Sequence, residues 1–233
     1  MEIIYHTADI AKTRSSLNKL FNSGVSTIEI DVVMTKDGIP IWTHDTIPTL
    51  FLKSNSSKIE DPITLYDVLD INKHSCKLML DFKYIQRDIL NSKKFEELLN
   101  TLNAYDEMQI QSLDLAFINK LIYNNYSNIE VGLTVNILTR SFINKLKIPK
   151  LQNLDFMALS SELWEQRKGK FIDDCNSIYP DIKKYGWIWQ RRTKKTNGIE
   201  NKDTIEAIIN NAAAAGIITN NPELVKKRIN SSR

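Results

Sequence analysis

Short runs of apolar and β-branched residues recur along the chain, and the stretches between them return to an apolar residue every three or four positions. The first pattern is typical of strands buried on both faces, and the second of helices that bury one face. One helical stretch, 204–215, is expected to end at Gly216. The expected strands are 2–5, 27–34, 77–82, 108–111, 129–135, 156–159, 185–190 and 216–219.

Eight strands in 233 residues leave about 29 residues per repeat, enough for a strand, a crossover helix and two loops. This arrangement predicts an α/β fold, a (β/α)8 TIM barrel, in a single domain over residues 1–233. An open doubly wound sheet is the alternative, but it ordinarily carries a glycine fingerprint after its first strand. Here that turn is His6-Thr7-Ala8-Asp9.

One extra apolar segment, 39–43, follows the turn at Asp37-Gly38. An Asp-Gly pair marks a tight turn, so we expect this segment to run back beside the second strand as a hairpin partner. The loop 45–62 would then cover one end of the barrel. The polar stretch 191–202 is typical of a solvated loop.

The composition argues against two classes of protein, those that coat nucleic acid and those anchored in a membrane. The chain has 31 Lys and Arg against 28 Asp and Glu, a net charge of +3, which is too balanced for a protein that coats nucleic acid. No run approaches the roughly 18 apolar residues of a membrane span, so we expect no stable membrane anchor. Two distant cysteines, Cys76 and Cys175, fit a reducing cytoplasmic location. The sequence leaves the oligomeric state unknown.

Acidic side chains meet at the expected strand ends, where barrel enzymes assemble their sites. Glu29 and Asp31 are two positions apart, so they share one face of a strand whose other residues are apolar. Two buried carboxylates repel each other unless a cation lies between them. With Asp81 from a neighbouring strand they predict a divalent metal site, suited to Mg²⁺ or Ca²⁺. The alternative is an outward-facing polar pair, or an ion pair with Lys83.

Two histidines fall at the same end. His6 closes the first strand and His44 follows the hairpin partner, whereas His74 precedes the third strand and is read as a surface residue. A histidine can also simply cap a strand, and this is the plainer interpretation of His6. A metal, two imidazoles and the lysine at position 83 suit the cleavage of a phosphate ester, because one imidazole can accept a proton while the other donates one.

These residues resemble the glycerophosphodiester phosphodiesterase family, which shares its barrel with phosphatidylinositol phospholipase C. The most specific stretch, 24–45, contains Glu-x-Asp, Thr-Lys-Asp-Gly and His-Asp in the order and spacing of the family. Weaker similarity covers 64–69, 80–83, 110–114 and 216–224. The likeness therefore spans nearly the whole chain.

The resemblance implies a role for each matching residue. It implies His6 and His44 as the acid and base, Glu29, Asp31 and Asp81 as metal ligands, Lys83 on the phosphate, and Trp187 as a stacking residue.

The sequence departs from the family at several positions. Thr7 stands where the family has an arginine, and Arg191 and Arg192 are candidates to replace that arginine. Asp81 stands where the family usually has Glu, and the family's Glu-Asn-Thr segment is not recognisable in 10–17.

The expected function is therefore metal-dependent hydrolysis of a small glycerophosphodiester to glycerol 3-phosphate and an alcohol. Two alternatives stay open: an intramolecular transfer that gives a cyclic phosphate, and a degenerate barrel that binds an anion without turnover.

Overall fold

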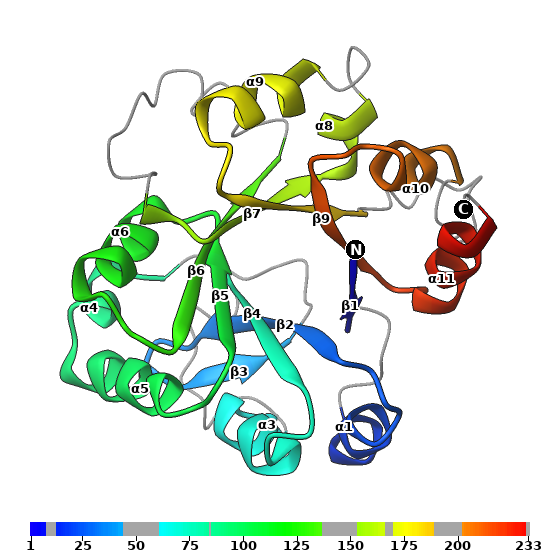
Figure 1. Ribbon diagram of the computed structural model, residues 1–233. Coiled ribbons are helices and arrows are strands. Elements are labelled where there is room, and N and C mark those ends of the chain that lie inside the picture. The colour runs from blue at the N-terminus through cyan, green and yellow to red at the C-terminus, as the bar shows by residue number, and fades with distance from the viewer. Residues whose placement is uncertain are drawn as a thin grey trace, which may run out of the picture. The chain divides into compact units, whose positions relative to one another are not determined.

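A computed structural model describes residues 1–7, 13–43, 61–83, 85–136, 153–165, 170–188 and 202–231 (Figure 1). The strands are β1 (Glu2–His6), β2 (Thr27–Met34), β3 (Pro40–Trp42), β4 (Lys77–Phe82), β5 (Met108–Ser112), β6 (Ile129–Val135), β7 (Phe156–Ser160), β8 (Lys183–Trp187) and β9 (Ala214–Thr219). The helices are α1 (Arg14–Phe21), α3 (Leu65–Asn72), α4 (Arg87–Leu90), α5 (Lys93–Asn103), α6 (Leu115–Asn124), α8 (Ser161–Glu165), α9 (Lys170–Ile178), α10 (Lys202–Ile209) and α11 (Pro222–Ser231). Among the described residues, no helix combines the length and apolar character needed to cross a membrane.

The strands hydrogen-bond in the order β1-β9-β8-β7-β6-β5-β4-β2-β3, and β1 also pairs with β2. The registers of β1 with β9, β2 with β4, β4 with β5, β7 with β8 and β8 with β9 are all parallel, whereas β3 runs antiparallel to β2. Parallel strands joined by helices, in an order that returns to the first strand, define the (β/α)8 TIM barrel. The predicted fold is confirmed, with β3 as an addition to the eight parallel strands.

Contacts between residues divide the chain into two compact units. One contains Met1–Tyr5 and Leu133–Arg233, and the other contains His6–Gly132. The extent of the domain, residues 1–233, stays a prediction.

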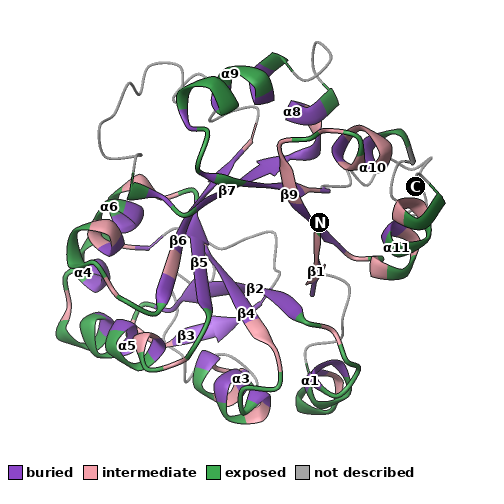
Figure 2. Ribbon diagram, in the orientation of Figure 1, coloured by how far each residue is buried: buried purple, intermediate pink, exposed green. Residues whose placement is uncertain are grey.

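In the unit His6–Gly132, β2 is buried along its whole length, and helices α3, α5 and α6 each bury one side (Figure 2). Three phenylalanines join the sheet to these helices. Phe82 of β4 packs edge to face with Phe95 of α5 and Phe117 of α6, with ring centroids 6.5 and 5.2 Å away. Because Phe82 faces the helices, its neighbour Asp81 faces the opposite side of the sheet.

The predicted turn before the hairpin partner is present. Gly38 has a φ of +78°, a conformation that glycine adopts without strain, and its N–H donates to the carbonyl of Thr35 at 3.0 Å. The following residues form β3, which pairs Trp42 with Val32 of β2. The expected hairpin is therefore confirmed, whereas the loop 45–62 lies outside the described residues except for its last two positions.

In the other unit, the predicted helix 204–215 is wrong at its end. Helix α10 stops at Ile209, and Ala214 and Ala215 belong to β9. Alanine is a strong helix former, but here strand pairing with β1 and β8 outweighs that local preference. Gly216 permits this pairing because an added Cβ would lie 2.6 Å from the backbone oxygen of Glu2.

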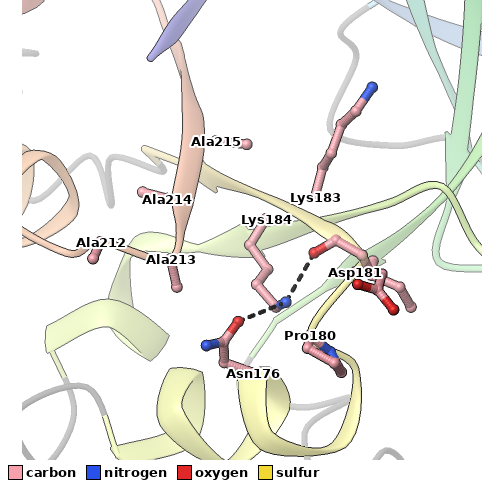
Figure 3. Close-up of a pocket in the computed structure, with 10 residues that line it drawn as sticks. Asn176, Pro180, Asp181, Lys183, Lys184, Ala212, Ala213, Ala214 and Ala215 are labelled. Atoms are coloured by element: carbon pink, nitrogen blue, oxygen red, sulfur yellow. Dashed lines mark hydrogen bonds between the residues drawn. The ribbon is translucent and has the colours of Figure 1, made fainter.

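A lysine is buried at the beginning of β8. The ammonium of Lys184 donates to Asn176 Oδ1 at 3.1 Å and to the carbonyl oxygens of Tyr179 at 2.6 Å and Ile182 at 2.8 Å. Figure 3 shows the bond to Asn176. These three bonds tie the end of α9 to the strand and use all three N–H groups of the ammonium. A pocket of about 410 Å³ lies beside them, at the ends of β8 and β9 opposite to the expected catalytic ends.

Candidate active site

Three carboxylates from two neighbouring strands lie on one face of the sheet. Asp31 of β2 is in register with Asp81 of β4, and Glu29 is two residues before Asp31. Their exposed fractions are only 1%, 6% and 2%, respectively. The period of two along a strand therefore places these acidic groups in the interior, as the sequence predicts.

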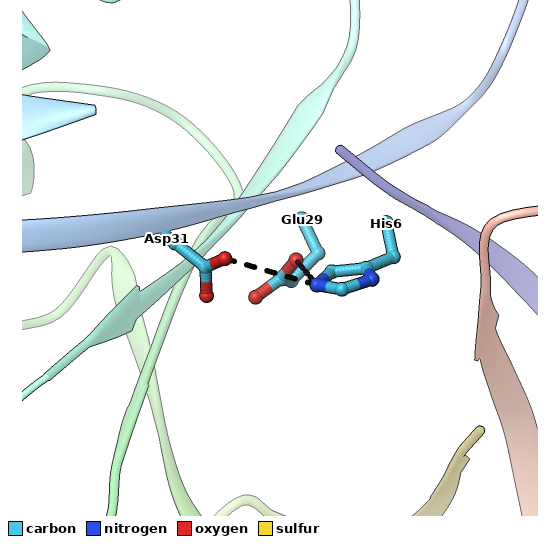
Figure 4. A group of neighbouring side chains, drawn as sticks. All are labelled: His6, Glu29 and Asp31. Atoms are coloured by element: carbon cyan, nitrogen blue, oxygen red, sulfur yellow. Dashed lines mark ion pairs between the residues drawn. The ribbon is translucent and has the colours of Figure 1, made fainter. Parts of the chain in front are cut away.

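His6 brings an imidazole to the same place from the end of β1. Its Nε2 is 3.4 Å from Glu29 Oε2 and 3.8 Å from Asp31 Oδ2, and Figure 4 shows this ring edge directed at both carboxylates. His6 is itself buried. It is therefore more than a strand cap, because its imidazole is part of the acidic cluster.

Lys83 follows β4 directly and supplies a cation to this cluster. Its ammonium forms ion pairs with Asp31 and with Asp81. The ion pair that the sequence offers as an alternative to a metal site is thus present. It exists together with the convergence of three carboxylates and one imidazole, so the two interpretations describe one site.

The two carboxylates of β2 have pKa values shifted in opposite directions. Burial, reinforced by the charge of Asp31, raises the pKa of Glu29 to about 8. Burial acts to raise the pKa of Asp31 as well, but the positive charge of Lys83 and the interactions with His6 hold it well below its usual range. Glu29 therefore carries the proton most easily, and Asp31 stays ionised.

Burial and neighbouring charges also set the pKa values of Asp81 and Lys83. Burial raises the pKa of Asp81, although Lys83 opposes the shift. Burial would lower the pKa of Lys83, but the charges of Asp31 and Asp81 outweigh it and raise the pKa above its ordinary value. The ammonium is therefore held in its charged form between two carboxylates.

The cluster fits the divalent ion that the sequence predicts. Buried Glu29 Oε2 accepts no hydrogen bond from any residue that the structure describes. Within the same described part of the chain, His6, Glu29 and Asp31 offer ligand atoms that all lie within 4.8 Å of one another. Carboxylate oxygens suit Mg²⁺ and Ca²⁺, so Glu29 and Asp31 can hold such an ion. Asp81, the third predicted ligand, is engaged by Lys83 in this structure.

Thr7, which replaces the arginine of the resemblance, has a structural contact. It is fully buried, and its Oγ1 accepts a hydrogen bond of 3.2 Å from Trp42 Nε1. The side chain that follows His6 therefore links β1 to β3. No pattern in the sequence indicates this contact.

The remaining predicted residues are distributed as follows. Trp187 ends β8 and is half-buried, in the unit that does not contain the acidic cluster. His44, Arg191 and Arg192 lie outside the described residues. The predicted roles of all these residues stay predictions.

Sequence reasoning did not single out Gln111 of β5. It is in register with Asp81, it is 3% exposed, and its Oε1 is buried without a hydrogen-bond donor among the described residues. The available signal was the alternation of Gln109 and Gln111 in a strand next to an acidic strand.

Comparison with solved structures supports the fold. A glycerophosphodiester phosphodiesterase from Parabacteroides distasonis superposes with a TM-score of 0.72 at 15% identity, covering 99% of this chain and 97% of that one. A phosphodiesterase from Oleispira antarctica, solved with its product sn-glycerol-3-phosphate, has a TM-score of 0.71 at 13% identity over 99% and 97%. The glycerophosphodiester phosphodiesterase from Thermotoga maritima has a TM-score of 0.65 at 13% identity over 97% of both chains.

Comparison of sequences identifies the family. A search of curated proteins gives no match. Residues 9–224, however, match the model of the glycerophosphoryl diester phosphodiesterase family. Because this match spans most of the chain, the protein belongs to the glycerophosphoryl diester phosphodiesterase family, and with it to the phosphoric diester hydrolases.

Proposed function

We propose that this protein hydrolyses a small glycerophosphodiester to sn-glycerol 3-phosphate and an alcohol, with a divalent metal ion as cofactor. One observation carries the proposal: an imidazole, three carboxylates and an ammonium from three strands converge in the unit His6–Gly132 of a chain in this family. The structure of the Oleispira antarctica phosphodiesterase with sn-glycerol-3-phosphate supports the choice of substrate.

In the proposed reaction a water oxygen attacks phosphorus and the bond from phosphorus to the leaving oxygen breaks. One imidazole accepts the proton of the water, and the other donates a proton to the leaving alcohol. We assign these roles to the pair His6 and His44. The resident ion, held by Glu29 and Asp31 with Asp81 as the third proposed ligand, would supply positive charge for the phosphoryl oxygens.

Lys83 has two tasks in this scheme. Its ammonium lowers the pKa of Asp31 and opposes the rise in the pKa of Asp81, and it lies on the face where the phosphoryl oxygens would bind. We further propose that Trp187 stacks on the substrate and that Arg191 or Arg192 supplies the phosphate contact that Thr7 cannot make. Thr7 carries no charge and its Oγ1 accepts from Trp42 Nε1, so it cannot replace the arginine that the family has at this position.

The test uses purified protein, glycerophosphocholine, and Mg²⁺, Mn²⁺ or Ca²⁺ in turn, with enzymatic detection of glycerol 3-phosphate. The wild type should release product, and His6→Ala and His44→Ala should each abolish the release. His74→Ala is the matched control, because His74 is exposed and stacks on Tyr105 with ring centroids 4.6 Å apart. A wild type that is inert on a broad panel of phosphodiesters with every metal would contradict the proposal.

The same experiment separates the two alternatives. Phosphorus NMR of the product distinguishes a cyclic phosphate from a monoester, because their chemical shifts differ widely. A degenerate barrel would instead bind the substrate in calorimetry without metal and give no product over hours.

We also propose a cytoplasmic, single-domain enzyme without a nucleic-acid partner. The net charge of +3 and the two free cysteines, Cys76 and Cys175, support this proposal. Cell fractionation tests the location. A single unfolding transition seen by both fluorescence and circular dichroism tests the domain assignment.

A further inference from the structure

Gln111 is a buried polar residue that the proposed mechanism does not use. It lies on β5 in register with Asp81 of β4, which is in turn in register with Asp31 of β2. Residues paired in this way have side chains on the same face of a sheet, with strands about 4.8 Å apart. Gln111 therefore belongs to the same layer of side chains as the acidic cluster.

The amide oxygen of Gln111 has no hydrogen-bond donor among the described residues. Gln111 is only 3% exposed, and its buried Oε1 accepts no hydrogen bond from any described residue. Leaving a buried acceptor unsatisfied destabilises a fold, so such a group in a polar site calls for an explanation. A ligand with an O–H or N–H group would supply the missing bond.

A second glutamine on the same strand provides a contrast. Gln109 also faces this side of β5, one layer further from the strand end, and its Nε2 donates to Glu130 Oε2 at 2.5 Å. Gln109 is fully buried, and its Oε1, like that of Gln111, accepts no hydrogen bond from a described residue; the bond from its Nε2 nevertheless anchors its amide to β6. No comparable anchor holds the amide of Gln111 among the described residues.

The strand order defines which part of a ligand Gln111 can reach. His6, Glu29 and Asp31 belong to β1 and β2, Lys83 follows β4, and β5 lies on the far side of β4. Gln111 therefore lies next to Asp81, and β4 separates it from His6, Glu29 and Asp31. A phosphodiester bound at Lys83 would extend one of its two alcohol groups over β5.

We propose that Gln111 is a substrate-specificity residue, whose amide oxygen accepts a hydrogen bond from a free hydroxyl of the substrate's alcohol group. The inference rests on the proposed function, and it adds the residue that would select a diester with a free hydroxyl group over a diester without one.

The experiment compares two substrates on two enzymes with the same metal. Gln111→Met, which keeps the length but removes the acceptor, should lower kcat/KM for glycerophosphocholine roughly tenfold, as expected for one lost hydrogen bond. Its kcat/KM for bis(p-nitrophenyl) phosphate, which has no hydroxyl, should stay within about twofold. The loss should appear mainly in KM, because the hydroxyl is not a reacting group.

A second measurement excludes a merely structural role. Replacing an unsatisfied acceptor by methionine should leave the Tm of the free protein unchanged or higher. The matched control Gln109→Met should lower the Tm, because it leaves Glu130 without its amide donor, and should leave the substrate ratio unchanged. A lower Tm for Gln111→Met, with equal losses on both substrates, would overturn the inference.

Failure of the proposed function would look different. If the wild type turns over neither substrate, calorimetry with sn-glycerol 3-phosphate and ethyl phosphate still tests Gln111 as a binding residue. A preference for the hydroxylated monoester that disappears in Gln111→Met supports the inference, and equal affinities in the wild type refute it.

Discussion

Replacing Lys83 by methionine should destabilise the metal-free protein strongly. The ammonium lies between Asp31 and Asp81, which are 1% and 6% exposed, so its loss leaves two buried carboxylates without their counter-charge. Breaking a buried ion pair from one side costs about 3–5 kcal/mol. For a chain of this size that corresponds to a fall in Tm of roughly 6–20 °C. Urea unfolding followed by circular dichroism in EDTA measures the loss.

A divalent ion should recover part of this loss, because it would neutralise the same carboxylates. An ion at a hundred times its Kd stabilises a folded protein by about 2.7 kcal/mol. It should bind the variant more tightly than the wild type, because no ammonium then competes for Asp31 and Asp81. The difference in unfolding free energy between Lys83→Met and the wild type should therefore shrink when Mg²⁺ or Ca²⁺ replaces EDTA.

The matched control is Lys77→Met, because Lys77 begins β4, the strand that Lys83 follows, and lies on the same face. Lys77 Nζ is 3.4 Å from Glu130 Oε2, and the side chain of Glu130 is 32% exposed. The Lys77→Met change should therefore lower the unfolding free energy by about 1 kcal/mol or less, and this loss should be the same with and without the ion. If Lys83→Met unfolds with the wild-type free energy, or if its deficit is the same with and without the ion, the cation does not have the role described here.

Three further changes test other parts of the fold. Phe117→Ala removes a fully buried ring from the phenylalanine cluster and should lower the unfolding free energy by about 3–5 kcal/mol in urea titrations. Gly216→Ala places a Cβ 2.6 Å from the backbone oxygen of Glu2 and should cost more than Gly24→Ala, which has a φ of +78° but nothing within 4 Å; thermal melts compare the two variants. Burial raises the pKa of Cys76 to about 12, so at pH 8 roughly one thiol in ten thousand is ionised and Ellman's reagent should react slowly until urea is added.

Most of the fold could be predicted because the pattern of apolar residues reports burial directly. The continuous apolar run of β2 and the Asp37-Gly38 turn before β3 each correspond to one local physical cause. The end of α10 could not be predicted in this way. Ala214 and Ala215 favour a helix by themselves, and only the pairing of β9 with strands distant in sequence makes them extended.

Part of the site could also be predicted from the sequence. The strand period places Glu29 and Asp31 on one face, so the meeting of carboxylates is visible in the residues alone. The pairing of Lys83 with both Asp31 and Asp81 depends on the register between β2 and β4, which sequence spacing does not reveal. The unsatisfied oxygen of Gln111 depends on which donors the neighbouring strands bring to it, and these follow only from the three-dimensional structure.

The buried ammonium of Lys184 turns a pair of adjacent lysines into an internal reporter of unfolding. Lys183 is exposed, whereas Lys184 is 1% exposed and donates to three oxygens. Acetylation requires a deprotonated, accessible amine, so a reagent such as acetic anhydride should modify the first and spare the second. The ratio of the two products in mass spectrometry then measures how often the β8 and α9 region opens, without any label or engineered residue.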